Sequence, residues 1–321
     1  MTQPFEDLPT TSEAEALVDT AFSRAARSGK AKTGLDGQRS MLQTAANVLS
    51  DNLDHVATSW PDFDTLHPFY YELADAVAGV DALRQHLSET TWASRKVDEI
   101  KTEYQSRLRD DVETAAKHRR QAFARMGDVV REVADNLAAI EDARADLARL
   151  PDVRPDEPTV VVAGYPNVGK TSLVNAATRA DNEVATYPYT TTGLAVGHFE
   201  RDHVRYQLVD TPGLLDRPAE ERNEIESQTV TALTHAADAV LFLVDASEAC
   251  GYGLDAQLAL RDEVRARFPD AGFHTVCNKA DRSRDVTADH YVSVADGEGI
   301  DDLLAAAVAT TAHEPELPFE S

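Results

Sequence analysis

Apolar and polar residues follow different patterns in the two halves of the chain. From residue 12 to residue 150, apolar residues recur every three or four positions, which places them on one face of an α-helix. From residue 159 onward, short apolar runs alternate with segments of helical period, as in chains whose strands and helices follow one another in turn. The pattern therefore predicts an all-helical domain over residues 1–150 and an α/β domain over residues 159–321.

The first domain is predicted to be a bundle of long helices. A capping-box pattern from Ser12 to Glu15 opens the first helix, and Pro61 ends the second. A third helix is expected over residues 67–88. The remaining run, residues 94–150, holds a single glycine and no proline, so we expect one long helix or two helices in line.

Three prolines within residues 151–158 interrupt the helical pattern, and this segment is the expected linker. Beyond it, strands alternate with helices, which predicts a doubly wound, mostly parallel sheet. The expected strands are 159–164, 193–200, 204–210, 239–245, 273–278 and 291–294. The expected helices begin at residue 170, cover 226–237 and 253–267, and begin again at residue 299.

The sequence GYPNVGKTS, residues 164–172, lies between an expected strand and an expected helix and has the spacing of a phosphate-binding P-loop. Its glycines allow backbone amides to wrap phosphates, and the N-terminus of the following helix adds favourable dipole charge. Lys170 is expected to bridge the β- and γ-phosphates, and the Thr171 hydroxyl to bind Mg²⁺. The other residues expected to bind the phosphates are Gly164, Tyr165, Pro166, Asn167, Val168, Gly169 and Ser172.

NKAD, residues 278–281, indicates which base is bound. It follows an apolar strand and therefore lies on the same rim of the sheet as the P-loop. A buried Asp281 carboxylate can accept two hydrogen bonds from guanine, whereas adenine would leave it unpaired, so GTP is expected rather than ATP. The further residues expected around the base are Asn278, Lys279, Ser293 and Val294.

DTPG, residues 210–213, follows the expected strand 204–210. Asp210 is expected to hold Mg²⁺ through water, and the Gly213 amide to contact the γ-phosphate. Thr211 and Pro212 complete this part of the nucleotide site. The three motifs together predict a domain that binds GTP and GDP with Mg²⁺.

A threonine-rich stretch, ATYPYTTTGL, separates the P-loop from DTPG. One of its threonines is expected to reach Mg²⁺ when GTP is bound. We expect this ligand to be Thr191, with Thr190 as the alternative.

The composition bears on the compartment. The chain has 56 acidic and 31 basic residues, a net charge of −25, and the acidic residues are scattered through both halves. Dispersed carboxylates keep a protein hydrated at high salt, so we expect a cytoplasm rich in K⁺. No apolar run approaches the roughly 20 residues of a membrane span, and Cys250 and Cys277 lack metal-ligand spacing. A cytoplasmic protein without a membrane partner is expected.

The motifs GYPNVGKTS, YPYTTTG, VGH, DTPGLLDRP and DASEACGYGLDAQ together resemble the nucleolar-type GTP-binding protein (Nog) family of Obg-like translation-factor GTPases. HPFYYELADAV, ASRKVDEIKTEY and RRQAFARMGDVV resemble the helical domain of the same family. The resemblance, with the acidic composition, implies a short archaeal, halophilic form. It also implies a role in assembling or maturing the large ribosomal subunit, whose RNA the helical domain would contact.

Two positions bear on hydrolysis, for which Lys170, Thr191, Gly213 and Asn167 are the expected catalytic residues. Where many GTPases carry a glutamine that orients the attacking water, this chain has Leu214. An aliphatic side chain cannot orient water, so slow intrinsic hydrolysis is expected. Asn167 is interpreted either as a ligand of a K⁺ ion, as in related GTPases, or as an ordinary loop amide.

The best candidate for RNA contact is the basic stretch KHRRQAFARM on a predicted helix. It concentrates Lys117, Arg119, Arg120 and Arg125, within a segment, residues 101–150, that holds 10 basic and 10 acidic residues. The residues alone favour a solvated, salt-bridged helix face, whereas the resemblance favours RNA.

The sequence as a whole predicts a slow GTPase switch that acts on the large ribosomal subunit or its precursor and is monomeric when free. In the alternative, the protein binds GTP with negligible hydrolysis and serves as a placeholder on the ribosome. A signalling or tRNA-modifying GTPase would require an added β-rich domain or a catalytic cysteine beside a cofactor site, and the sequence indicates neither.

Overall fold

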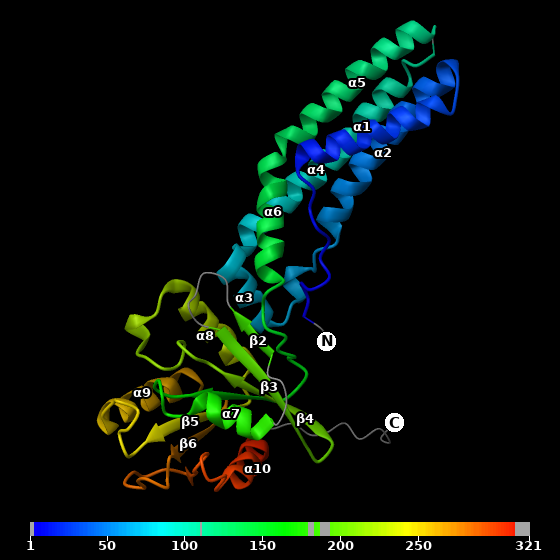
Figure 1. Cartoon of the computed structure of the whole chain (residues 1–321). Helices are drawn as coiled ribbons and strands as arrows, with labels where there is room; N and C mark the ends of the chain where they lie inside the picture. Colours follow the sequence, from blue (N-terminus) through cyan, green and yellow to red (C-terminus); the bar gives the residue numbers. More distant parts are fainter. Residues whose placement is uncertain (1–2, 110, 179–182, 187–192, 312–321) are drawn as a thin grey trace. The chain divides into compact units, whose positions relative to one another are not determined.

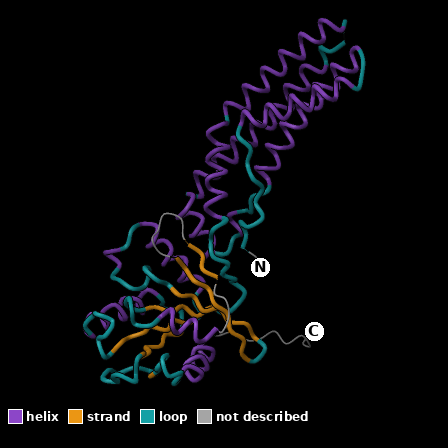
Figure 2. The backbone as a smooth tube through the Cα atoms, viewed as in Figure 1, coloured by secondary structure: helices purple, strands orange, loops and turns teal. Residues whose placement is uncertain are grey.

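The structure is a computed structural model that describes residues 3–109, 111–178, 183–186 and 193–311 (Figures 1 and 2). It divides into two compact units. The helical unit comprises Phe5–Asp64 and Ala78–Ala148, and the second unit comprises Met1–Pro4, Thr65–Val77 and Arg149–Ser321. Within the described residues, no helix is both long enough and apolar enough to cross a membrane.

The helical unit is built around α2, which packs against α1, α4 and α5. Its core is a continuous apolar cluster that includes the fully buried Leu49, Leu53 and Met126. The capping box expected at Ser12 and Glu15 is wrong, because Glu13 is the N-cap of α1 and the Glu15 carboxylate accepts from Arg131 instead. The helices are α1 (Ala14–Lys30), α2 (Gly34–Thr58), α4 (Val80–Gln105), α5 (Val112–Glu132) and α6 (Ala134–Leu147).

Two helix breaks differ from the expected pattern. The helix expected over 67–88 is interrupted at Gly79, whose φ of 65° lies in the left-handed region that glycine adopts at low cost. The run expected over 94–150 is interrupted between α4 and α5, which pack against each other rather than lying in line (Figure 1). Asp111 begins α5 as its N-cap by accepting from the amides of Glu113 and Thr114.

The segment 65–77, within the range expected for the first domain, belongs to the second unit. It contains most of α3 (Pro68–Ala78). The buried Tyr70 hydroxyl donates to the carbonyl oxygen of Val153 at 2.7 Å, and burial raises the pKa of Tyr70. This long-range hydrogen bond ties α3 to the chain that enters the sheet.

The second unit contains a seven-stranded sheet in the order β2-β3-β4-β1-β5-β6-β7. Strands β4, β1, β5, β6 and β7 are parallel, whereas β2, β3 and β4 pair in antiparallel fashion. The expected α/β P-loop class with a mostly parallel sheet is confirmed. The strands are β1 (Thr159–Ala163), β2 (Glu183–Thr186), β3 (Gly193–Arg201), β4 (Val204–Asp210), β5 (Ala239–Asp245), β6 (Gly272–Asn278) and β7 (His290–Tyr291).

Helices connect these strands and cover the sheet (Figure 1). Helices α7 and α10 pack against each other, α7 over β1, β3 and β4 and α10 over β5 and β6. The strand expected over 291–294 contains two residues, and β2 was not expected, because its four residues lack an apolar run. The helices are α7 (Lys170–Thr178), α8 (Glu224–Ala236), α9 (Leu254–Arg267) and α10 (Ile300–Thr310), with 3₁₀ turns η1 (Phe63–Thr65) and η2 (Ala219–Glu221).

The register of the parallel strands brings the sequence motifs to one edge. Val162 pairs with Asp210, the last residue of β4, and Asp245 pairs with Asn278 at the ends of β5 and β6. The carboxyl ends of parallel strands form the edge at which ligands bind in open α/β sheets. The P-loop, DTPG and NKAD therefore meet there.

Candidate functional site

The loop between β1 and α7 has a conformation that requires its glycines. Gly164 and Gly169 have φ angles of 134° and 106°, which other residues rarely adopt. A Cβ on Gly164 would lie 2.5 Å from the Leu243 carbonyl oxygen, and one on Gly169 would overlap the Asn278 side chain. The backbone is thus held close to the neighbouring strand ends, as a phosphate-binding loop requires.

Lys170 closes this loop from the first turn of α7. Its side chain is buried, and its Nζ donates to the carbonyl oxygens of Gly164 at 2.6 Å and Tyr165 at 3.1 Å. Burial lowers the pKa of Lys170, and the carboxylates of Asp216 and Asp210 partly oppose that shift. The arrangement presents a desolvated cation beside the loop amides.

Thr171 and Asp210 form the oxygen-rich side of the site. The Thr171 hydroxyl donates to Oδ2 of Asp210 at 2.5 Å. The other oxygen, Oδ1, is buried and has no hydrogen-bond partner among the described residues. Burial raises the pKa of Asp210, against the opposing effects of Thr171 and Lys170. Hydroxyl and carboxylate oxygens are the ligands that Mg²⁺ prefers, so these two side chains fit that ion.

The third expected Mg²⁺ ligand, Thr191, and its alternative, Thr190, lie outside the described residues.

The DTPG segment turns sharply after β4. The Thr211 hydroxyl donates to the Val162 carbonyl oxygen at 2.9 Å, which fixes the segment to β1. Gly213 has a φ of 77°, and its amide donates to Oδ2 of Asp216 at 2.7 Å. Leu214 is buried, with 2% of its surface exposed, so its side chain packs into the protein.

NKAD is tied to the P-loop by two hydrogen bonds. The buried Asn278 amide donates to the Val168 carbonyl oxygen at 2.8 Å, and its Oδ1 accepts from the Val294 amide at 3.4 Å. The Lys279 ammonium donates to the Asn167 carbonyl oxygen at 2.8 Å. Asn278, expected on the base, therefore also sets the position of the phosphate loop.

Asp281 differs from the expectation of a buried carboxylate. Its side chain is 32% exposed and accepts from the Ser293 hydroxyl at 2.9 Å. Ser293 is itself buried, and its hydroxyl lies equally close, at 2.9 Å, to Oδ2 of Asp296, which competes for the same proton. A bound base would have to cover Asp281 before an unpaired carboxylate there could discriminate against adenine.

Not all P-loop residues expected to bind phosphates line the hollow beside the loop; Tyr165 and Val168 do not. Tyr165 stacks on Tyr252 with ring centroids 4.3 Å apart, and Val168 is fully buried. The hollow has a volume of about 500 Å³ and is lined by Pro166, Asn167, Gly169, Lys170, Thr171, Ser172, Pro212, Asp216 and Lys279.

Two acidic residues at this site, Asp216 and Asp245, were not predicted from the sequence. Asp216 lines the hollow, and the fully buried Asp245 accepts from the Lys279 ammonium at 2.6 Å and from the Cys250 amide at 2.9 Å. Burial acts to raise the pKa of Asp245, but Lys279 and Ser247 outweigh it and the pKa is lowered. An aspartate directly after the apolar run of β5 was the available signal for Asp245.

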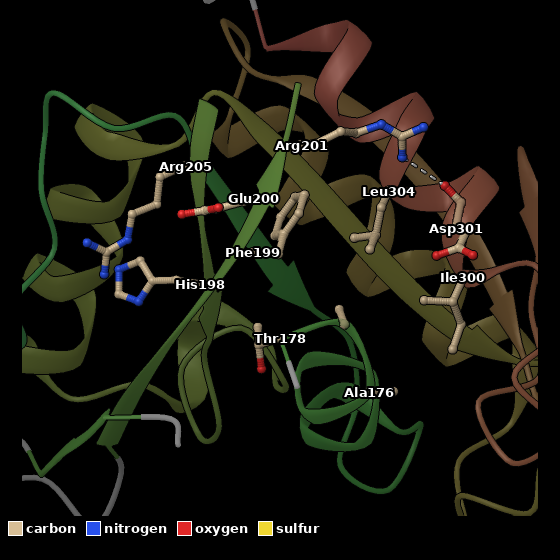
Figure 3. Close-up of a pocket in the computed structure, with 11 residues that line it drawn as sticks. Ala176, Thr178, His198, Phe199, Glu200, Arg201, Arg205, Ile300, Asp301 and Leu304 are labelled. Atoms are coloured by element: carbon tan, nitrogen blue, oxygen red, sulfur yellow. Dashed lines mark hydrogen bonds between the residues drawn. The ribbon is translucent and has the colours of Figure 1, made fainter. Parts of the chain in front are cut away.

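A second hollow of about 500 Å³ lies at the C-terminal end of α7 (Figure 3). Its side chains come from α7, β3, β4 and α10, and Arg201 donates to the Asp301 carbonyl oxygen at 3.3 Å. We place the candidate site at the other end of α7, where Lys170, Thr171 and Asp210 meet.

The residues expected to contact RNA fall into two pairs on α5. Arg119 donates to Gln38 at 2.8 Å and lies over the Phe123 ring, and Arg125 pairs with Glu103. Lys117 and Arg120 are exposed and form no ion pair among the described residues. Arg119 and Arg125 thus contact other side chains of the helical unit, whereas Lys117 and Arg120 face solvent.

Solved structures with a similar fold include nucleolar GTP-binding protein 1 from Plasmodium falciparum, with a TM-score of 0.46 and 32% identity, covering 50% of this chain and 90% of that one. The G domain of the FeoB iron transporter from T. maritima has a TM-score of 0.40 and 24% identity, covering 48% of this chain and 98% of that one.

Curated relatives include nucleolar GTP-binding protein 1 of Drosophila melanogaster, 37% identical over 233 residues, or 72% of this chain and 36% of the relative. An uncharacterized protein of Methanocaldococcus jannaschii is 39% identical over 229 residues, or 71% of this chain and 64% of the relative. The chain thus spans about a third and less than two thirds, respectively, of their lengths.

Two family models match the chain. The model of the NOG1 N-terminal helical domain matches residues 5–154, and that of nucleolar GTP-binding protein 1 (NOG1) matches residues 224–281. These matches confirm the family indicated by the sequence motifs. The chain belongs to the nucleolar GTP-binding protein 1 family.

Proposed function

We propose that this protein binds GTP, hydrolyses it slowly to GDP and phosphate, and acts as a switch on the large ribosomal subunit or its precursor. The observation that carries the proposal is the pair of hydrogen bonds from Asn278 and Lys279 to the P-loop. They join a segment suited to guanine and a loop suited to phosphates into one site. The curated relatives of Drosophila melanogaster and Saccharomyces cerevisiae are named nucleolar GTP-binding protein 1, which supports GTP as the ligand.

The phosphates would lie in the hollow beside Lys170. The amides of the P-loop and the Lys170 ammonium would neutralise the phosphate oxygens. Thr171 would hold Mg²⁺ directly and Asp210 through water, with Thr191 as the further ligand. The ion held by these residues would supply positive charge that offsets the negative charge developing on the phosphates during hydrolysis.

Hydrolysis requires a water molecule to attack the γ-phosphate while GDP leaves. The buried Leu214 cannot orient that water, so we infer a low intrinsic rate. The exposed Asn167 lines the hollow and is the proposed ligand of a K⁺ ion, whose charge would assist the departure of GDP. Loss of the γ-phosphate would release the Gly213 segment and change the surface offered to the ribosome.

The ribosomal contact is assigned to the helical unit. Lys117 and Arg120 are exposed and unpaired among the described residues, so they are the side chains best placed to bind RNA phosphates. Arg119 and Arg125 would have to give up contacts within the unit before they could do so. The protein is proposed to be a cytoplasmic monomer when free.

Sedimentation with large ribosomal subunits tests this proposal. The protein should pellet with the subunits to a greater extent in one of two conditions, with GDP or with a non-hydrolysable GTP analogue, both with Mg²⁺. Equal sedimentation under both conditions would refute the switch. Failure to bind either guanine nucleotide would refute the proposal as a whole.

The buried Leu214 also favours a second candidate, a placeholder that holds GTP on the subunit with negligible hydrolysis. Single-turnover hydrolysis measured with and without large subunits separates the two. A switch requires hydrolysis that the subunit accelerates, whereas a placeholder shows none in either condition.

A further inference from the structure

Asp216 brings a negative charge into the hollow where phosphates are proposed to bind. It lines that hollow together with Lys170 and Thr171, and 9% of its surface is exposed. Its Oδ2 accepts from the Gly213 amide at 2.7 Å. A largely buried carboxylate is unexpected in a site that binds anions, because its negative charge repels a bound phosphate.

The chain holds Asp216 in this place from both sides. The carbonyl oxygen of the preceding residue, Leu215, accepts from the Gly164 amide at 3.1 Å at the start of the P-loop. The following residue, Arg217, pairs with the buried Glu226 of α8 at 2.7 Å. The carboxylate is thus positioned by the P-loop on one side and by α8 on the other.

The Gly213 amide is the group that distinguishes GTP from GDP in the proposed site. It is expected to donate to the γ-phosphate, which GDP lacks. An amide carries a single proton, so it cannot make good hydrogen bonds to Asp216 and to the γ-phosphate at the same time. GTP must therefore break the Gly213–Asp216 bond, whereas GDP can leave it intact.

The charge of Asp216 acts in the same direction. Burial is the main cause of the lowered pKa of Lys170 and of the raised pKa of Asp210; the charge of Asp216 opposes the first shift and adds to the second, so its field reaches both groups. A second negative group beside it is repelled in this poorly solvated hollow. The repulsion falls mainly on the phosphate nearest Gly213, which only GTP contains.

We propose that Asp216 is a specificity-determining residue that occupies the place of the γ-phosphate on the Gly213 amide and so weakens GTP binding relative to GDP. The inference rests on the proposed function, because it assumes that guanine nucleotides bind in this hollow. It assigns to Asp216 the setting of the GTP-to-GDP preference. A partner that moved Asp216 away would then favour the GTP-bound form.

The test measures the dissociation constants of GDP and of a non-hydrolysable GTP analogue by titration calorimetry in Mg²⁺ buffer. Asp216→Ala removes both the charge and the acceptor, whereas Asp216→Asn removes the charge and keeps an acceptor oxygen. For Asp216→Ala, affinity for the analogue relative to GDP should rise about tenfold, the value of one hydrogen bond to a charged group. Asp216→Asn should give a smaller rise.

Asp270→Ala is the matched control, because Asp270 is exposed and lies outside the hollow. It should leave the ratio of the two constants unchanged. If Asp216→Ala and Asp216→Asn, each checked for native circular dichroism, leave the ratio at the wild-type value, the inference is overturned while guanine binding stands. If the wild-type protein binds neither nucleotide, the proposed function fails and the inference fails with it.

Discussion

Replacing Asp245 by asparagine should destabilise the second unit, which contains the sheet, more than the replacement of any exposed charged residue does. The Asp245 side chain is fully buried and accepts hydrogen bonds from Lys279, from the Ser247 amide and hydroxyl, and from the Cys250 amide. Asparagine keeps the shape but turns one acceptor oxygen into an NH₂ donor. That donor would face either Lys279 and the Cys250 amide or the Ser247 groups, which are also donors.

The size of the destabilisation can be estimated from the donors that lose the Asp245 carboxylate. Removing one member of a buried ion pair costs about 3–5 kcal/mol. Because the Lys279 side chain is 22% exposed, water can partly solvate its ammonium, which reduces that cost to about 1–3 kcal/mol. One or two further donors lose an acceptor, at about 1 kcal/mol or more each. We therefore expect the free energy of unfolding to fall by about 2–4 kcal/mol.

The pH dependence provides a second signature of the same interaction. The pKa of Asp245 is lowered in the folded protein. A lowered pKa adds stability that is fully present above the ordinary carboxyl value of about 4 and is lost as the pH falls through the folded value. The difference between wild type and Asp245→Asn should therefore be constant near neutrality and shrink below about pH 4.

Urea unfolding can assign the loss to one unit. Both tryptophans of the chain, Trp60 and Trp92, lie in the helical unit, so tryptophan fluorescence follows that unit. Far-ultraviolet circular dichroism follows both units. Asp245→Asn should shift the dichroism transition and leave the fluorescence transition in place. A loss no larger than that of the exposed control Asp270→Asn would refute the reasoning.

Three further predictions concern nucleotide and RNA. Asp281→Asn replaces the acceptor of two proposed guanine hydrogen bonds, so GTP affinity measured by calorimetry should fall about a hundredfold; an unchanged affinity would contradict the guanine assignment. GTP turnover should be faster in K⁺ than in Na⁺ at matched ionic strength if Asn167 binds K⁺, and equal rates would exclude that role. Lys117→Glu with Arg120→Glu should weaken sedimentation with ribosomal subunits at unchanged GTP affinity, whereas unchanged sedimentation would move the RNA contact elsewhere.

Several strands and helices of the second unit were predictable to within a few residues because their signals are local. Strand β5 has the bounds that its apolar run indicated, and the helix after the P-loop begins at Lys170 as expected. The P-loop lies beside the ends of the neighbouring strands because parallel strands end at one edge of the sheet. This places Gly164 close to Leu243 and Gly169 close to Asn278. The class of fold and the place of the candidate site both follow from such signals.

The parts that the sequence did not predict depend on contacts between distant residues. Asp216 lies six residues after Asp210, and nothing in its neighbours' polarity indicates that its carboxylate reaches the Gly213 amide. Helix α3 groups with the sheet, and the hydrogen bond from Tyr70 to Val153 joins residues 83 positions apart. Contacts of this kind do not produce a pattern of apolar and polar residues that could be recognised in the sequence.

If nucleotide binds as proposed, the hydrogen bonds between NKAD and the P-loop would couple base recognition to phosphate binding. Lys279 donates to Asp245 at 2.6 Å and to the Asn167 carbonyl oxygen at 2.8 Å. Asn167 has a φ of 64°, in the left-handed region that asparagine adopts more readily than most residues. Asn278 adds a second connection through Val168. A base bound at Asp281 would therefore act on a segment that already fixes the position of the P-loop. Because the Asp245–Lys279 pair positions the loop without nucleotide, binding energy from the base would remain available for ordering the γ-phosphate contacts.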